Sequence, residues 1–174
     1  HWHFWRGDGY LVGGDGNDLL SGNSKNDILI GDAGNDILYG GTDIDSMVGG
    51  DGNDTFYKDS EDDIMVEDVG AGTDWVYSSI NIHQLQDNIE NIVIYGALTG
   101  ANSFAVGNSV NNKIYVAQLD FPISHEAGVT LSGGLGNDTL VGNFSGKIFG
   151  YAESPAAIGD LSDRVANDYL IGGD

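Results

Sequence analysis

The chain has no cysteine, which excludes disulfide bonds and thiolate metal sites. It has only 6 lysine and arginine residues against 27 aspartate and glutamate residues, and the basic residues are scattered. Nucleic acids and other polyanions require clustered basic side chains, so both kinds of partner are disfavoured. The sequence also lacks an apolar run of about 18 residues and a basic segment followed by an apolar one, so we predict no membrane span and no signal peptide.

Glycine and acidic residues are present in excess, with 28 glycines and a formal net charge of −21 in 174 residues. A chain of this length is expected to form one structural unit. Charge repulsion, and the backbone entropy that glycine loses on folding, both oppose a stable fold. The composition therefore predicts a fold that needs a cation bound by oxygen ligands.

A nine-residue repeat begins at Gly13. The units are GGDGNDLLS, GNSKNDILI, GDAGNDILY, GGTDIDSMV, GGDGNDTFY and the degenerate KDSEDDIMV. Position eight is always large and apolar, and position six is always aspartate: Asp18, Asp27, Asp36, Asp45, Asp54 and Asp63. The alternation around position eight is typical of a strand with one buried face, so each unit is predicted to be a six-residue turn and a three-residue strand.

Such short strands need stacked neighbours to bury position eight, which predicts a solenoid. If two units make one coil, the strands form two parallel sheets and the aspartates form two columns. We call these the first column (Asp18, Asp36 and Asp54) and the second column (Asp27, Asp45 and Asp63). Neighbouring strands lie about 4.8 Å apart, so oxygens of successive coils surround one point. An all-oxygen cage suits Ca²⁺ better than Mg²⁺ or Zn²⁺.

The units match the pattern G-G-x-G-x-D-x-U-x of the RTX (repeats-in-toxin) calcium-binding family. The match is close over residues 13–65 and recurs in GGLGNDTLV, Gly133 to Val141. The chain thus resembles this family, which implies an all-β, right-handed parallel β-roll or β-helix solenoid. The resemblance also implies several Ca²⁺ ions in the turns and export of the unfolded chain by a type I secretion system.

In this family each Ca²⁺ lies between turns two units apart, held by backbone carbonyls and by both position-six aspartates. In the first column, the resemblance implies that Gly13, Asp15 and Asp18 face Asp32, Gly34 and Asp36, and that Gly31, Ala33 and Asp36 face Gly50, Gly52 and Asp54. In the second column, it implies that Gly22, Ser24 and Asp27 face Gly41, Asp43 and Asp45, and that Gly40, Thr42 and Asp45 face Asp59, Glu61 and Asp63. Further candidate ligands are Gly49, Asp51, Gly70, Gly72, Asp74 and Asp138.

The second column departs from the family pattern. Lys25 and Asp43 replace the position-four glycine, and Lys58 and Asp59 replace the opening glycines of the sixth unit. We expect these replacements to remove backbone positions that tolerate a positive φ. The first column is therefore predicted to bind calcium more tightly than the second.

The pattern divides the chain into four segments. Residues 1–12 are predicted to be an N-terminal cap or the tail of a preceding domain, and residues 13–77 the calcium-binding β-roll. Residues 78–130 are predicted to continue as a metal-free β-helix, with Asn112 at position six. Residues 131–174 are predicted to be a second RTX-like segment with an inserted surface loop at about 145–164. Because the chain lacks an initiator Met and ends at the opening of another unit, we expect a fragment of a longer protein.

No motif marks an active site among the many carboxylates, so these residues are predicted not to be an enzyme, although the parent protein can be one. The leading hypothesis is a calcium-dependent folding and spacer module of a secreted or cell-surface bacterial protein. One alternative is a polysaccharide-binding or adhesin module, as appended to alginate-modifying enzymes, with Tyr39, Tyr57, Trp75 and Tyr77 as outward aromatics. Another alternative is the non-catalytic part of a secreted hydrolase or toxin.

Overall fold

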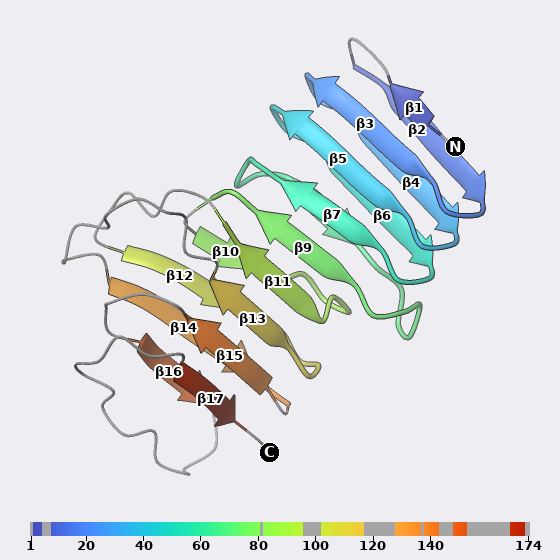
Figure 1. Cartoon of the computed structure of the whole chain (residues 1–174). Helices are drawn as coiled ribbons and strands as arrows, with labels where there is room; N and C mark the ends of the chain where they lie inside the picture. Colours follow the sequence, from blue (N-terminus) through green and yellow to red (C-terminus); the bar gives the residue numbers. More distant parts are fainter. Residues whose placement is uncertain are drawn as a thin grey trace. The chain divides into compact units, whose positions relative to one another are not determined.

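A computed structural model of the chain describes residues 2–4, 8–80, 82–95, 102–116, 128–136, 138–142, 148–152 and 168–172 (Figure 1). The chain forms two compact units, His1–Ser78 with Gln86–Ile89, and Ser79–Leu85 with Glu90–Asp174. Every element of regular secondary structure assigned in the described residues is a β-strand, which confirms the predicted all-β class. Within the same residues we find no helix with the length and apolar character that crossing a membrane requires.

The first unit is a parallel β-solenoid. Its strands are β1 (Trp2–Phe4), β2 (Tyr10–Asp15), β3 (Leu19–Ser24), β4 (Ile28–Ala33), β5 (Ile37–Thr42), β6 (Ser46–Asp51), β7 (Thr55–Lys58), β8 (Ile64–Val66) and β9 (Trp75–Ser78). One sheet has the order β1-β3-β5-β7-β9 and the other β2-β4-β6-β8, and the neighbours are parallel. Because consecutive strands alternate between the sheets, two nine-residue repeats make one coil, as Figure 1 shows.

The position-eight side chains form the core of this unit. Leu20 pairs with Leu38, and Leu38 with Phe56, in successive strands of one sheet. These three side chains, and Leu29 and Met47 of the other sheet, are 0% exposed. Burying an apolar side chain of this size contributes about 1.5–3 kcal/mol. The solenoid therefore owes much of its packing energy to one residue in each nine-residue repeat.

The strands are longer than predicted. Strands β2 to β6 have six residues each and continue through position three of the following unit. The physical reason is that the turns also stack in register, with Gly14 opposite Asp32 and Ser24 opposite Thr42, so the parallel ladder runs into the turn. The turn backbones of successive coils are thereby held face to face.

The second unit is described by itself and in less detail. Its strands are β10 (Ile82–Gln84), β11 (Asn91–Ile94), β12 (Asn102–Val106), β13 (Lys113–Val116), β14 (Gly128–Gly134), β15 (Asp138–Gly142), β16 (Ile148–Ala152) and β17 (Asp168–Gly172). They form the sheets β10-β12-β14-β16 and β11-β13-β15-β17. All described pairs here are parallel except β15 with β17.

Two predicted segments at the margins are only partly described. In the first, β1 pairs with β3, so residues 2–4 extend a sheet of the solenoid. In the second, strand β16 lies inside the loop predicted at 145–164 and pairs with β14, so residues 148–152 form a strand there and not a loop. The rest of that predicted loop lies outside the described residues.

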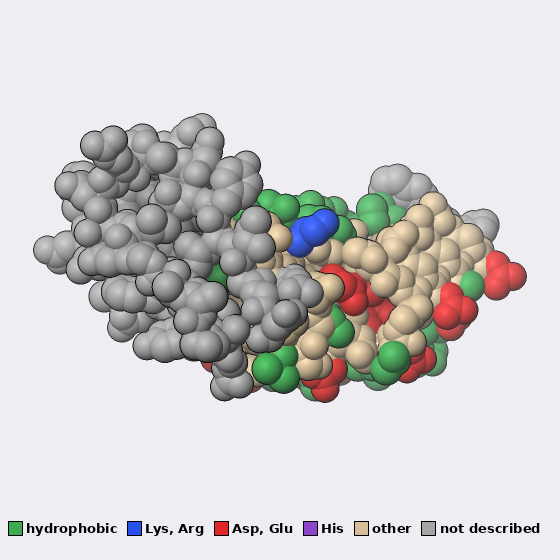
Figure 2. Space-filling model, turned by 90° about the horizontal axis from the view of Figure 1, so that it is seen from below, with side chains coloured by type: hydrophobic (Ala, Val, Ile, Leu, Met, Phe, Trp, Pro, Cys, Tyr) green, Lys and Arg blue, Asp and Glu red, His purple; other side chains and the backbone are tan. Residues whose placement is uncertain are grey.

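Acidic side chains do not gather into one patch on the face shown in Figure 2. They are scattered, together with hydrophobic side chains, over a surface made largely of backbone and uncharged polar atoms. Exposed backbone is expected where glycine-rich turns reach the surface. Other acidic side chains of the first unit are buried in its turns, which are described next.

Candidate calcium sites

The position-six aspartates are buried and ordered by backbone hydrogen bonds. In the first column, Oδ1 of Asp36 accepts from the backbone N–H of Asp18, and Oδ1 of Asp54 from that of Asp36, each at 2.7 Å. In the second column, Oδ1 of Asp45 accepts from the N–H of Asp27 at 2.8 Å. All of these aspartates are at most 3% exposed. One carboxylate oxygen of each later aspartate is thus committed to linking successive coils.

The second carboxylate oxygen points inward. Oδ2 of Asp27, Asp36, Asp45 and Asp54 is buried and accepts no hydrogen bond from the described part of the chain. Buried carboxylate oxygens in native proteins normally have a donor or a cation beside them. Each column therefore holds a row of buried oxygens to which no group in the described part of the chain donates a hydrogen bond.

These oxygens converge with backbone carbonyls beside the position-one glycine. A Cβ placed on Gly13 would lie 2.8 Å from the carbonyl oxygen of Gly31 and 2.9 Å from Oδ2 of Asp18. A Cβ on Gly31 would likewise meet Oδ2 of Asp36 and the carbonyl of Gly49. Glycine leaves this space open, and oxygens of two coils surround it. A set of oxygen donors without nitrogen or sulfur fits Ca²⁺.

Burial makes these carboxylates costly to ionise. Desolvation raises the pKa of Asp27 and Asp36, against the lowering effect of the backbone N–H that each accepts. It raises the pKa of Asp45 and Asp54 to about 6, helped by the neighbouring carboxylates of the same column. A divalent cation in the turns would reverse this effect by stabilising the charged form.

The other predicted ligands of the first column lie along the stacked turns. The position-three carbonyls of Ala33 and Asp51 accept the N–H groups of Gly16 and Gly34, each at 2.7 Å. The position-two carbonyl of Asp32 faces the α-carbon of Gly50 in the next coil. The turns of successive coils therefore lie against one another, and the assignment of these residues as calcium ligands stays a prediction.

The second column keeps its turn shape, contrary to the expectation from sequence. Lys25 has a φ of 77° and Asp43 a φ of 86°, so both adopt the left-handed conformation of the glycine that they replace. The cost for a non-glycine residue is about 1–2 kcal/mol. It is tolerated because the stacked ladder holds the backbone, and the N–H of Lys25 donates to Oδ2 of Asp43 at 3.1 Å. The replacement of glycine by Lys25 and Asp43 therefore strains the backbone but does not change the shape of the turn.

The sixth turn does differ. Lys58, at position one, is 3% exposed, and its Nζ donates to the carbonyls of Asp63 at 2.6 Å and Glu61 at 3.0 Å. Oδ2 of Asp63 accepts the N–H groups of Asp59 at 3.2 Å and Ser60 at 3.0 Å. Desolvation lowers the pKa of Lys58, although nearby Asp63 opposes this shift. The Lys58 ammonium and two backbone N–H groups thus donate hydrogen bonds to oxygens of this turn, which the repeat pattern assigns as calcium ligands.

Asp74 continues the first column across a two-residue slip. Oδ1 of Asp74 accepts the N–H of Asp54 at 2.8 Å, with a spacing of 20 residues where earlier links have 18. The backbone of the predicted residues Gly70 to Gly72 stacks on the preceding turn, because Ala71 accepts the N–H of Gly52 at 2.8 Å. Asp74, one of the further candidate ligands, therefore lies at the next step of the first column after Asp54.

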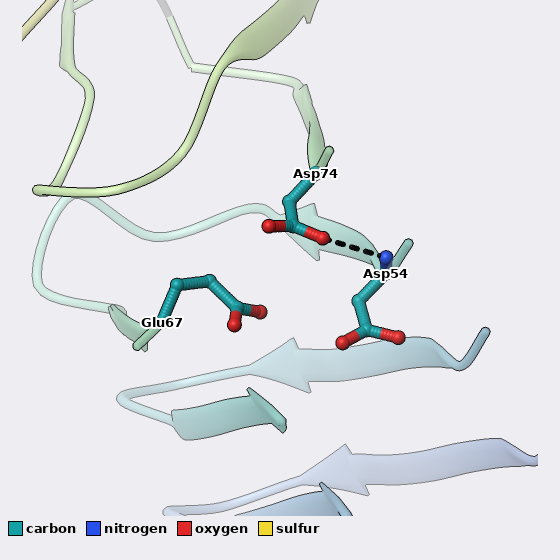
Figure 3. A group of neighbouring side chains, drawn as sticks. All are labelled: Asp54, Glu67 and Asp74. Atoms are coloured by element: carbon teal, nitrogen blue, oxygen red, sulfur yellow. Dashed lines mark hydrogen bonds between the residues drawn. The ribbon is translucent and has the colours of Figure 1, made fainter. Parts of the chain in front are cut away.

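Glu67 joins Asp54 and Asp74, and the sequence reasoning missed it. Figure 3 shows the three carboxylates directed toward a common space, and one oxygen of each lies within 4.8 Å of the others. Two like charges at this distance repel by about 3–4 kcal/mol at an effective dielectric constant of about 20. The available signal was that Glu67 follows KDSEDDIMV at position one, where glycine is usual.

The asparagines at position five form a second ladder, which was also not foreseen. The N–H of Asn35 donates to Oδ1 of Asn17 at 2.9 Å, and that of Asn53 to Oδ1 of Asn35 at 2.8 Å. This ladder runs in the opposite direction along the chain from the aspartate ladder. Together the two ladders join each turn to both of its neighbours.

In the second unit, Asp138 repeats the arrangement and Asn112 does not. Oδ1 of Asp138 accepts the N–H of Asn112 at 2.8 Å, and its Oδ2 accepts no hydrogen bond from the described residues. The side-chain amide of Asn112 donates to the carbonyl of Glu90 at 3.2 Å and to Oδ1 of Asn108 at 3.1 Å. A neutral donor thus lies at Asn112 where the calcium pattern has a carboxylate.

Comparison with known families matches the turns just described. The RTX calcium-binding nonapeptide repeat matches residues 12–47, 31–65 and 129–144, with four copies. Searches among curated proteins and among solved structures give no match. The matched residues include both aspartate columns and Asp138. These parts of the chain are therefore RTX calcium-binding nonapeptide repeats, folded as a parallel β-solenoid.

Proposed function

We propose that the chain is a calcium-dependent folding and spacer module of a secreted or cell-surface protein. The supporting observation is the row of buried Oδ2 atoms in Asp27, Asp36, Asp45 and Asp54, which accept no hydrogen bond from the described residues. Leaving a buried charge uncompensated costs several kcal/mol. When bound, calcium would neutralise these carboxylates and link successive coils. The ligands proposed are those that the repeat implies in the two columns, with the Asp59, Glu61 and Asp63 turn as the weakest because Lys58 already binds there.

Calcium concentration would act as the switch. Extracellular modules bind calcium with Kd values of about 10⁻⁴–10⁻³ M, so such sites are empty in the cytosol and filled outside. The net charge of −21 then opposes folding before export, and binding free energy becomes folding free energy afterwards. The RTX repeats support export by a type I secretion system, with the chain unfolded until it meets calcium. We propose no catalytic role for these residues.

The polysaccharide-binding alternative has less support. The rings of Tyr39 and Tyr57 stack with centroids 4.0 Å apart and an interplanar angle of 14°, and those of Tyr57 and Tyr77 at 5.2 Å and 15°. The ring faces therefore cover one another along the sheet. Stacking of a sugar on an aromatic ring needs an exposed face, so this ladder stabilises the sheet better than it would hold a glycan.

Circular dichroism tests the folding switch. We expect the β-sheet signal to appear when calcium is added to the metal-free chain and to disappear when the calcium is chelated. Magnesium at the same concentration is the control, because it fits a flexible cage of many oxygens less well. A β-sheet signal that chelation leaves unchanged would refute the proposal. A glycan screen on the calcium-loaded form tests the polysaccharide alternative.

A further inference from the structure

We propose that Glu67 is a side-chain calcium ligand that closes the first column with a three-carboxylate site, formed with Asp54 and Asp74. The nonapeptide pattern supplies only the position-six aspartates as carboxylate ligands, so Glu67 is an addition particular to this chain. The inference rests on the proposed function, because it takes calcium as the ion.

The distances suit one ion. Oxygens bound to the same Ca²⁺ at roughly 2.3–2.6 Å cannot be more than about 5 Å apart. One oxygen each of Asp54, Glu67 and Asp74 lies within 4.8 Å of the others, so all three fit a single coordination shell. Figure 3 shows them approaching the shared space from different sides.

An independent observation on Asp54 points to a ligand at this place. Asp54 is 0% exposed, and its Oδ1 accepts the N–H of Asp36 at 2.7 Å. Its Oδ2 is buried, is directed into the shared space and accepts no hydrogen bond from the described residues. A Cβ placed on Gly49 would meet both this atom and Oε1 of Glu67. The space beside the position-one glycine, which a backbone carbonyl oxygen borders in earlier coils, is thus bordered here by the Glu67 carboxylate.

The backbone positions Glu67 for this role. Glu67 directly follows β8 and comes 18 residues after Gly49, at the same position of the repeat. Its carbonyl accepts the side-chain amide of Asn88 at 2.9 Å, and Asn88 itself has a φ of 66°. Glu67 is 7% exposed, so the carboxylate is held inside the turn and does not reach into solvent.

A third carboxylate should make this site the tightest of the first column. Calcium affinity rises with the number of charged ligands and with the rigidity of the site. We therefore expect it to fill at the lowest calcium concentration, so that folding of the column starts at its C-terminal end.

The test is a calcium titration against a competing chelator. Glu67→Gln should weaken the tightest binding step by about ten- to a hundredfold, because the loss of one charged ligand lowers calcium affinity. Asp68→Asn, next to it in the chain and exposed, makes the same change in net charge and should leave that step unchanged. Terbium in place of calcium gives a second readout, since Trp75 adjoins Asp74 and should sensitise its luminescence. Trp75→Phe assigns that signal.

The outcomes separate the two proposals. If the wild-type chain binds no calcium, the proposed function fails. If it binds calcium and the titrations of Glu67→Gln and Asp68→Asn superimpose, the Glu67 assignment is overturned. Should Glu67→Gln not fold at any calcium concentration, Glu67→Asp keeps the charge on a shorter side chain. An unweakened tightest step in that variant would also overturn the assignment.

Discussion

Position one of the repeat shows how a single residue type decides what a turn can hold. Gly13 and Gly31 leave space in which a carboxylate oxygen and a carbonyl oxygen of two coils converge. At the same position Lys58 places an ammonium on backbone carbonyls, and Glu67 adds a carboxylate. Lys58 adds a positive charge to its turn, and Glu67 adds a negative charge to its turn. The position-one residues at the ends of the two columns therefore carry opposite charges.

Asp36→Ala should cost more calcium binding than Asp45→Ala. Asp36 lies between two turns of the first column, so its removal affects the sites on both sides, whereas one of the sites beside Asp45 already holds the Lys58 ammonium. We expect the loss of about two bound ions in Asp36→Ala and about one in Asp45→Ala, measured by calcium titration. Asp68→Ala, at the surface, is the control. An equal or larger loss in Asp45→Ala would contradict the ranking of the columns.

At the scale of the element, the turns and strands form one continuous ladder. Six-residue strands extend into the turns, the aspartate ladder links each coil to the preceding one, and the asparagine ladder links it to the following one. This continuity explains how Lys25 and Asp43 are held at positive φ. The sixth turn lacks such residues and relies on the Lys58 side chain for its internal hydrogen bonds.

Lys58→Met should destabilise the first unit even when calcium is saturating. The substitution removes two charge-assisted hydrogen bonds and leaves the carbonyls of Glu61 and Asp63 without that donor. We expect the free energy of unfolding to fall by about 2–3 kcal/mol, measured by urea denaturation. Lys25→Met, at an exposed position, should change it by no more than about 0.5 kcal/mol. Equal effects of the two substitutions would show that Lys58 has no structural role in the turn.

At the scale of the whole molecule, negative charge is the main obstacle to folding. The chain carries a net charge of −21, and its buried aspartates have raised pKa values in the metal-free fold. Two agents can remove this obstacle, a bound cation or a proton. Stability without calcium should therefore depend on pH in a direction opposite to ordinary acid denaturation.

Acidification should partly replace calcium. The pKa of Asp45 and Asp54 rises from an ordinary value of 3.8 to about 6 in the fold, so the folded chain binds more protons than the unfolded chain between these values. Their contribution to stability is complete below about pH 4 and is lost as the pH rises through about 6. Circular dichroism of the calcium-free chain should show more β structure at pH 4.5 than at about pH 7. A steady loss of structure on acidification would contradict this expectation.

Proton competition should also weaken calcium binding as the pH falls. The same carboxylates must be ionised to bind the ion, so apparent calcium affinity should decrease as the pH falls through about 6. Sodium chloride at matched ionic strength is the control, because it screens surface charge without filling the turns.

The sequence by itself determined the features that repeat. The period of nine, the apolar position eight and the invariant position-six aspartate establish the coil, its core and the two columns, because stacking identical units repeats each local choice. Only the tertiary structure decided what happens where the repeat fails. The Lys58 side chain turns back onto the carbonyls of Glu61 and Asp63, and the Glu67 carboxylate lies beside those of Asp54 and Asp74. The repeat pattern encodes neither contact, because both depend on how the stacked turns pack. The character of the last turn in each column is therefore a property of the stacked fold.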